Sequence, residues 1–190
     1  VRLVGSEMCI RDSRYIGCSN FPAWLVCKGL WESDRSKLTS LICVQESYHM
    51  LDRRIERELV PLCLSEGLGM MTYSATAVGL LTGRFRRGIE PPLNSIWANN
   101  LSRFEALMTE DADGVVRLLQ TIAADLGKSP AQVAINWILS KPGITAAMIG
   151  PDRVADVDDN FGAVGWSLTN EEIAMLDQGS SWSVSTGEIV

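Results

Sequence analysis

The chain has 190 residues, of which 46% are hydrophobic and 21% charged, and its net charge is −6, a balance that excludes disordered and fibrous classes. Its 17 basic and 23 acidic residues are scattered and form no basic stripe for nucleic acid, and no apolar run reaches the ~18 residues that span a membrane. We therefore expect a cytoplasmic globular domain that binds neither nucleic acid nor membranes.

From residue 14 onward, short apolar runs alternate with longer amphipathic ones, which indicates β/α units of a parallel sheet. The first unit pairs a strand over residues 14–20 with a helix over about 21–32. The second strand covers 41–45, and the helix that follows it ends at Gly67. The third strand covers residues 68–74.

The second half of the chain begins with a long Pro-rich and Asn-rich stretch, about 83–103, that has no obvious secondary structure. Regular patterns then return. The remaining expected elements are a helix over 113–126, a helix that Ser129 caps and Pro130 opens, a strand over 144–150, a helix that begins near 151–153, and a short helix capped by Thr169.

Four strand–loop–helix repeats fit either a small doubly wound sheet or part of a (β/α)8 barrel. No G-x-G-x-x-G follows the first strand, and VGLLTGRF lacks the Gly-Lys-Ser/Thr of a P-loop, which weakens the first option. The residues at the strand ends favour the barrel, because barrels bind ligands at that face. These residues are Ser19 with Asn20, Gln45, Tyr73 with Ser74, and Gly150 with Arg153.

Five segments in series resemble the aldo-keto reductase family: RYIGCSNFPAW, VQESYHMLDR, ERELVPLCLSEGLGMMTYSATAVGLLTGRF, SPAQVAINWILSKPGITAAMIG and DDNFGAVGWSLTNEEIAMLD. They occur in the family's order and at its spacing. The resemblance implies an α/β fold that is a partial (β/α)8 TIM barrel, about strands five to eight with their helices, so that residues 14–190 form its C-terminal half. Residues 1–13 resemble a translated sequencing-library adapter, and we expect them to be a non-native segment.

The resemblance implies a fragment of an NAD(P)H-dependent oxidoreductase that reduces aldehydes and ketones to alcohols. The parent protein would act on a small-molecule carbonyl substrate, with NADP, or else NAD, as cofactor. The family's catalytic Asp, Tyr, Lys and His lie on upstream strands, so we expect no catalytic residue and no activity in this chain. The alternatives are an NADP-binding regulatory subunit of the same fold with little or no turnover, and a small self-sufficient α/β binding module.

The nicotinamide end of the cofactor is assigned to three strand ends by the resemblance. Ser19, Asn20 and Gln45 would bind the carboxamide, a group with one acceptor and two donors, and Tyr73 would stack on the ring. Hydrogen bonding within the loops is the alternative role of the polar residues, because polar side chains are costly when buried unpaired. The alternative for Tyr73 is packing in the core.

The phosphate and adenosine ends are assigned in the same way to two later loops. The residues involved are Ser74, Ala75, Thr76 and Arg84 toward the phosphates, and Gly150, Arg153, Asp156 and Asn160 toward the adenosine. Arg153 would pair with a 2′-phosphate, which favours NADP over NAD. For the basic run around Arg84, a solvated loop is the alternative.

Other conspicuous residues suggest ordinary structural roles. We expect the lone histidine, His49, to be a solvated loop residue and not a catalytic one. The five cysteines are never spaced as CxxC, so we expect buried free thiols and no metal site. The spacing of Trp24, Trp31 and Trp137 predicts packing in the core.

Overall fold

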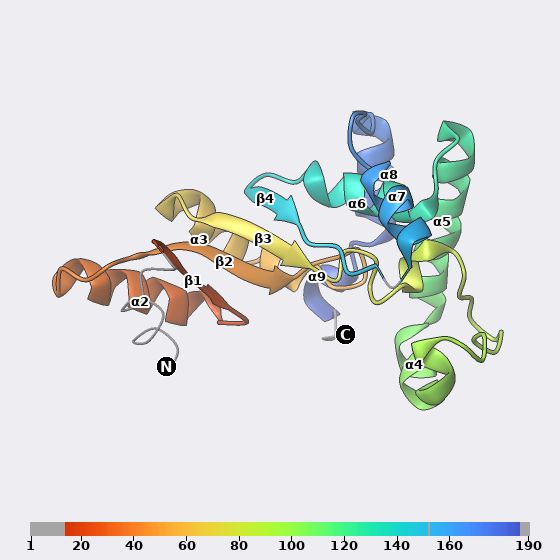
Figure 1. Cartoon of the computed structure of the whole chain (residues 1–190), viewed down its shortest axis with the longest axis horizontal. Helices are drawn as coiled ribbons and strands as arrows, with labels where there is room; N and C mark the ends of the chain where they lie inside the picture. Colours follow the sequence, from red (N-terminus) through yellow and green to blue (C-terminus); the bar gives the residue numbers. More distant parts are fainter. Residues whose placement is uncertain (1–13, 152, 187–190) are drawn as a thin grey trace.

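The computed structural model describes residues 14–151 and 153–186, and the expected non-native segment 1–13 lies outside this part of the chain. Its centre is a parallel sheet in the order β1-β2-β3-β4 (Figure 1). The strands are β1 (Ile16–Ser19), β2 (Leu41–Ser47), β3 (Gly69–Tyr73) and β4 (Ile144–Ala147). This arrangement confirms the α/β class and the partial barrel of β/α units.

The strand register aligns the ends of neighbouring strands. Ser19 lies opposite Gln45, and Gln45 lies opposite Met71. Directly paired residues of parallel strands share one face of a sheet, so these three side chains form a row across it. At the last pair of the β2–β3 ladder, Ser47 lies opposite Tyr73. The register therefore gathers Ser19, Gln45 and Tyr73 at one rim, as the sequence predicted.

Helices follow each strand, and in Figure 1 helices α4 to α8 gather at one end of the molecule while α2 and α3 flank the strands at the other. The α-helices are α2 (Ala23–Arg35), α3 (Leu59–Glu66), α4 (Leu101–Leu107), α5 (Glu110–Leu126), α6 (Pro130–Leu139), α7 (Val154–Phe161), α8 (Asn170–Gly179) and α9 (Ser183–Thr186). The short 3-10 helices are η1 (Arg54–Glu56), η2 (Leu80–Thr82) and η3 (Ile96–Asn99).

The predicted helix ends are confirmed where a local signal marks them. Ser129 and Thr169 both form capping boxes, in which the hydroxyl accepts the backbone N–H of the residue three positions later. Gly67 ends α3 with a left-handed φ of 68°, a conformation that glycine adopts without a steric penalty.

The stretch 83–103 is more ordered than the sequence predicts, because it contains η3 and the start of α4. Trp97 is buried, its Nε1 donates to the Val78 carbonyl at 3.1 Å, and its ring lies 6.2 Å from that of Phe104. Both elements are too short to show a helical period, and packing of aromatic rings stabilises them.

Two hydrophobic clusters stabilise the fold. The larger is built mainly on helices α5 and α6 and on the loop after β3 that contains η2, and its fully buried side chains include Trp137, Leu119 and Leu176. The smaller packs α2 and α3 against the sheet and consists of Val26, Val44, Leu59, Cys63, Leu68 and Met70. The first cluster confirms the predicted burial of Trp137.

The predicted burial of the other two tryptophans is wrong, since Trp24 and Trp31 are 64% and 62% exposed. Helix α2 turns Val26 toward the sheet. At 100° per residue, Trp24 and Trp31 then lie about 160° and 140° around the helix from Val26, so they face away from the core. The spacing identified one face of the helix but not which face is buried.

His49 is also placed differently from the prediction, because its side chain is fully buried instead of solvated. Its Nδ1 accepts the Leu51 backbone N–H at 3.2 Å, and burial lowers the pKa of its imidazole to about 4. Among the cysteines, Cys63 is buried as expected, whereas Cys27 is exposed on α2 and Cys18 and Cys43 are only partly covered.

Candidate functional site

Four side chains near the C-terminal ends of β1, β2 and β3 form two hydrogen-bonded pairs. The Ser19 hydroxyl donates to Gln45 Oε1 at 3.4 Å, and the Tyr73 hydroxyl donates to Asn20 Oδ1 at 2.7 Å. Gln45 Nε2 in turn contacts Met148 Sδ, just beyond β4, at 3.0 Å. Ser19 and Asn20 are exposed, and Gln45 and Tyr73 are half-buried. We call Ser19, Asn20, Gln45 and Tyr73 the strand-end cluster; within each pair the two side chains orient one another, and all four are at least partly open to a ligand.

The turn that carries Asn20 is unusual in its backbone. Asn20 has a φ of 60°, in the left-handed region that asparagine tolerates better than most residues. Its N–H donates to the Gln45 carbonyl at 3.2 Å, and the next N–H, of Phe21, donates to Glu46 Oε1 at 3.0 Å. Burial raises the pKa of Glu46, and these backbone donors oppose the rise. Strand β2 therefore fixes the turn from two consecutive residues.

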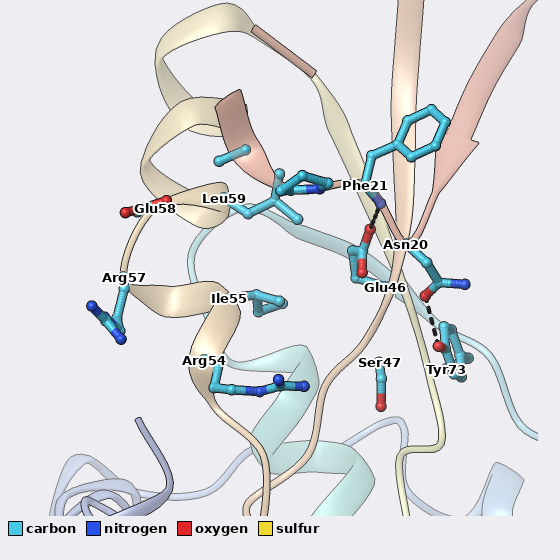
Figure 2. A pocket seen from close by; sticks show the side chains of 12 residues that line it. Asn20, Phe21, Glu46, Ser47, Arg54, Ile55, Arg57, Glu58, Leu59 and Tyr73 are labelled. Atoms are coloured by element: carbon cyan, nitrogen blue, oxygen red, sulfur yellow. Dashed lines mark hydrogen bonds between the residues drawn. The ribbon is translucent and has the colours of Figure 1, made fainter. Parts of the chain in front are cut away.

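A cavity of about 430 Å³ adjoins this turn (Figure 2). Its walls are the turn after β1, Glu46 and Ser47 of β2, and η1 with the beginning of α3. Figure 2 shows the Glu46 carboxylate directed at the Phe21 amide, beside the Asn20–Tyr73 hydrogen bond.

The loop after β3 is tightly coiled. Ser74 has a φ of 60°, and its carbonyl accepts the Ala77 N–H at 2.7 Å, while the Thr76 carbonyl accepts the Leu81 N–H at 3.0 Å. The side chain of Ala75 is buried in the larger hydrophobic cluster. A ligand at this loop would therefore meet the backbone of Ala75 and not its methyl group.

The basic run after this loop is divided between two roles. Arg86 is paired with Asp113 of α5, with its Nε and Nη2 donating at 2.7 and 3.1 Å, and this guanidinium lowers the pKa of Asp113 to about 2. Arg84 is exposed and lies 5.8 Å from the Phe85 ring. Arg86 thus anchors the loop, and Arg84 presents its charge at the surface.

At the predicted adenosine end, Arg153 precedes α7 and binds Asp156 through two hydrogen bonds of 2.9 and 2.5 Å. The Arg153 guanidinium lowers the pKa of Asp156, and Arg84 lowers it further. The structure therefore pairs Arg153 directly with Asp156. Gly150 is exposed beyond β4, and Asn160 is half-buried near the end of α7.

Two residues that were not predicted from the sequence, Met148 and Glu46, are connected to this site by the structure. Met148 contacts Gln45 across 103 positions, and no local pattern could have revealed that contact. Glu46 carried a usable signal, since a carboxylate inside an apolar strand needs a partner when it is buried. Within the described residues, no group of three or more His, Cys, Asp or Glu could hold a metal ion, and no helix is long and apolar enough to cross a membrane.

Comparisons with known protein sequences identify relatives of this chain. The sequence model of the Aldo/keto reductase family matches residues 12–180. The uncharacterized oxidoreductase YrpG of Bacillus subtilis is 31% identical over 86% of this chain and 48% of its own length. A probable voltage-gated potassium channel subunit beta of Arabidopsis thaliana is 31% identical over 79% and 46%, and the L-glyceraldehyde 3-phosphate reductase of Escherichia coli K12 is 29% identical over 86% and 48%.

The family match begins just before β1 and extends to the residue after the end of α8, so it includes every strand of the described sheet. The chain spans about half the length of the curated relatives it matches. The family match extends over the strand-end cluster and over Arg84 and Arg153. The chain belongs to the aldo/keto reductase family.

Proposed function

We propose that this chain is the cofactor-binding half of an NAD(P)H-dependent oxidoreductase that reduces small aldehydes or ketones to alcohols. The observation that carries the proposal is the strand-end cluster, which places a hydroxyl, two amides and an aromatic ring together at one rim of the sheet. Family membership and the oxidoreductase and reductase names of two relatives support it.

The cluster fits the chemistry of a nicotinamide. Its carboxamide has one acceptor and two donors, and the Ser19 hydroxyl with the Asn20 and Gln45 amides can pair with both kinds. The hydrogen bond between Tyr73 and Asn20 fixes the tilt of the phenol ring against which the nicotinamide would stack. When bound, the cofactor supplies the hydride. This chain's residues bind and orient the ring, and we propose that the proton donor lies on upstream strands.

The test is to recover the genomic DNA upstream of the Arg14 codon and to express the longer protein that it encodes. We expect carbonyl-dependent oxidation of NADPH, and affinity for NADPH about tenfold weaker after Asn20→Ala or Gln45→Ala, because each removes about one net hydrogen bond. The exposed Arg103→Ala variant is the control. Reduction of a carbonyl by the 190-residue chain alone would contradict the proposal.

A second candidate function is a regulatory subunit that binds NADP with little or no turnover. The observation in its favour is the similarity to a relative named as a probable potassium channel subunit beta. The same longer protein separates the two: an upstream Asp, Tyr, Lys and His with carbonyl-dependent turnover identifies the enzyme. Nucleotide binding without turnover, and without the Tyr, identifies the regulatory subunit.

The cofactor's 2′-phosphate gives a further prediction. We propose NADP as the cofactor. Asp156 limits the preference for NADP over NAD, because its carboxylate already binds the Arg153 guanidinium that would pair with the 2′-phosphate. We expect Asp156→Asn to raise the ratio of NADP to NAD affinity about two- to fivefold, the range of an exposed ion pair. Calorimetric titration of both nucleotides measures it. Asp158→Asn, on the same helix and exposed, is the control; equal ratios in both variants would refute the role of Asp156.

A further inference from the structure

We propose that Glu46 is a positioning residue for the strand-end cluster: it holds the turn from which Asn20 reaches Tyr73. This inference rests on the proposed function for the part that concerns the nicotinamide. Glu46 lies next to Gln45 in β2, and successive strand residues face opposite sides of a sheet. Gln45 can therefore face the ligand while Glu46 supports the turn from the other side.

The geometry of the turn leaves a donor that needs an acceptor. Phe21 precedes Pro22, which opens α2 and has no N–H, and no side chain caps this helix. The N–H of Phe21 is thus the last backbone donor before the helix, and Glu46 Oε1 accepts it at 3.0 Å across 25 positions. Glu46 is only 9% exposed, so its carboxylate is held in place as the acceptor for this N–H, although Phe21 itself is 44% exposed.

The conformation of Asn20 depends on this support. A left-handed φ costs an asparagine free energy, so the turn persists only while its neighbours hold it. The Gln45 carbonyl holds the Asn20 N–H, and Glu46 holds the next residue. If the Phe21 N–H loses the Glu46 carboxylate as its acceptor, the turn can relax, and the Asn20 amide then leaves the Tyr73 hydroxyl.

The charges around Glu46 explain why a carboxylate is tolerated there. Arg54 of η1 favours the ionised form of Glu46. The Arg54 guanidinium is itself held by both oxygens of Asp52, each at 2.7 Å. Burial raises the pKa of the Cys18 thiol of β1 and of the Cys63 thiol of α3, and the nearby Glu46 carboxylate adds to both rises. The surroundings of Glu46 thus supply one cation, Arg54, that is already paired with Asp52, and two neutral thiols. The Phe21 N–H is therefore a principal partner of the Glu46 charge.

The first experiment is NMR on the 190-residue chain, with Glu46→Gln and Glu46→Leu. In the wild type, we expect the Phe21 amide proton to titrate with a midpoint above the ordinary pKa of glutamate. Glu46→Gln keeps an acceptor, so Phe21 should stay protected from hydrogen exchange but lose the titration. Glu46→Leu should speed that exchange about tenfold or more. Glu58→Leu, at an exposed glutamate lining the same cavity, should change neither.

The second experiment measures, for the wild type and the same two Glu46 variants, the binding affinity for NADPH and for 2′,5′-ADP, which lacks the nicotinamide. Glu46→Leu should weaken NADPH binding about five- to tenfold and leave 2′,5′-ADP binding unchanged, and Glu46→Gln should restore NADPH affinity to within about twofold of wild type. Unchanged Phe21 exchange in Glu46→Leu would overturn the inference about Glu46. Faster exchange with unchanged NADPH affinity would instead overturn the assignment of Asn20 to the cofactor, and with it the proposed function of the cluster.

Discussion

Replacing Arg53 with alanine is expected to lower the free energy of unfolding by about 3–5 kcal/mol, the cost of breaking a buried ion pair from one side. The Arg53 side chain is 8% exposed and donates to both oxygens of Glu56 at 2.8 and 2.9 Å. It also donates to the Asp177 carbonyl and the Ser180 hydroxyl, both at 2.9 Å, and lies 5.2 Å from the Trp137 ring. Its loss would detach the end of α8 from η1.

Urea denaturation measures this effect, with two variants for comparison. Arg103→Ala removes an exposed arginine of α4 and should change stability by less than about 0.5 kcal/mol. Arg53→Lys should fall between the two, because lysine keeps the charge but cannot form the paired hydrogen bonds of a guanidinium. A loss for Arg53→Ala no larger than that for Arg103→Ala would show that the network does not stabilise the fold.

Acidification is expected to remove about 3 kcal/mol of stability through His49 alone. Burial lowers the pKa of the folded imidazole to about 4, Arg54 adds to this, and Asp52 opposes it. The unfolded chain has a pKa near 6.5 and takes up the proton first as the pH falls. The contribution of His49 is therefore complete above pH ~6.5 and is lost progressively down to about pH 4.

The difference between wild type and His49→Asn, followed by urea denaturation from about pH 4 to 7, isolates this effect. Glu46 has a raised pKa and therefore contributes an opposite slope, but it is present in both proteins and cancels. We expect the wild type to lose stability more steeply than the variant as the pH falls. Parallel curves would mean that the pKa of His49 is the same in the folded and the unfolded protein, which would contradict the prediction.

Some features of this protein follow from neighbouring residues and were predictable from the sequence. The capping boxes at Ser129 and Thr169 and the glycine end at Gly67 each depend on contacts within about one helical turn. The alternation of strands and helices likewise indicated the fold class. The polar residues at or just after the predicted strand ends pointed to the strand-end cluster, because parallel strands present their C-terminal ends at one rim, although β2 continues past the predicted end at Gln45 to Ser47.

Other features depend on how distant segments pack, which no local pattern specifies. Trp24 and Trp137 both occur at helical spacing, yet the first is exposed and the second fully buried, because the sheet and the neighbouring helices decide which face is covered. His49 is buried for the same reason. The sequence by itself determined the elements and the polar strand ends, through interactions close along the chain. Only the tertiary structure decided burial and the contact of Gln45 with Met148, because both require strand order to join segments far apart in sequence.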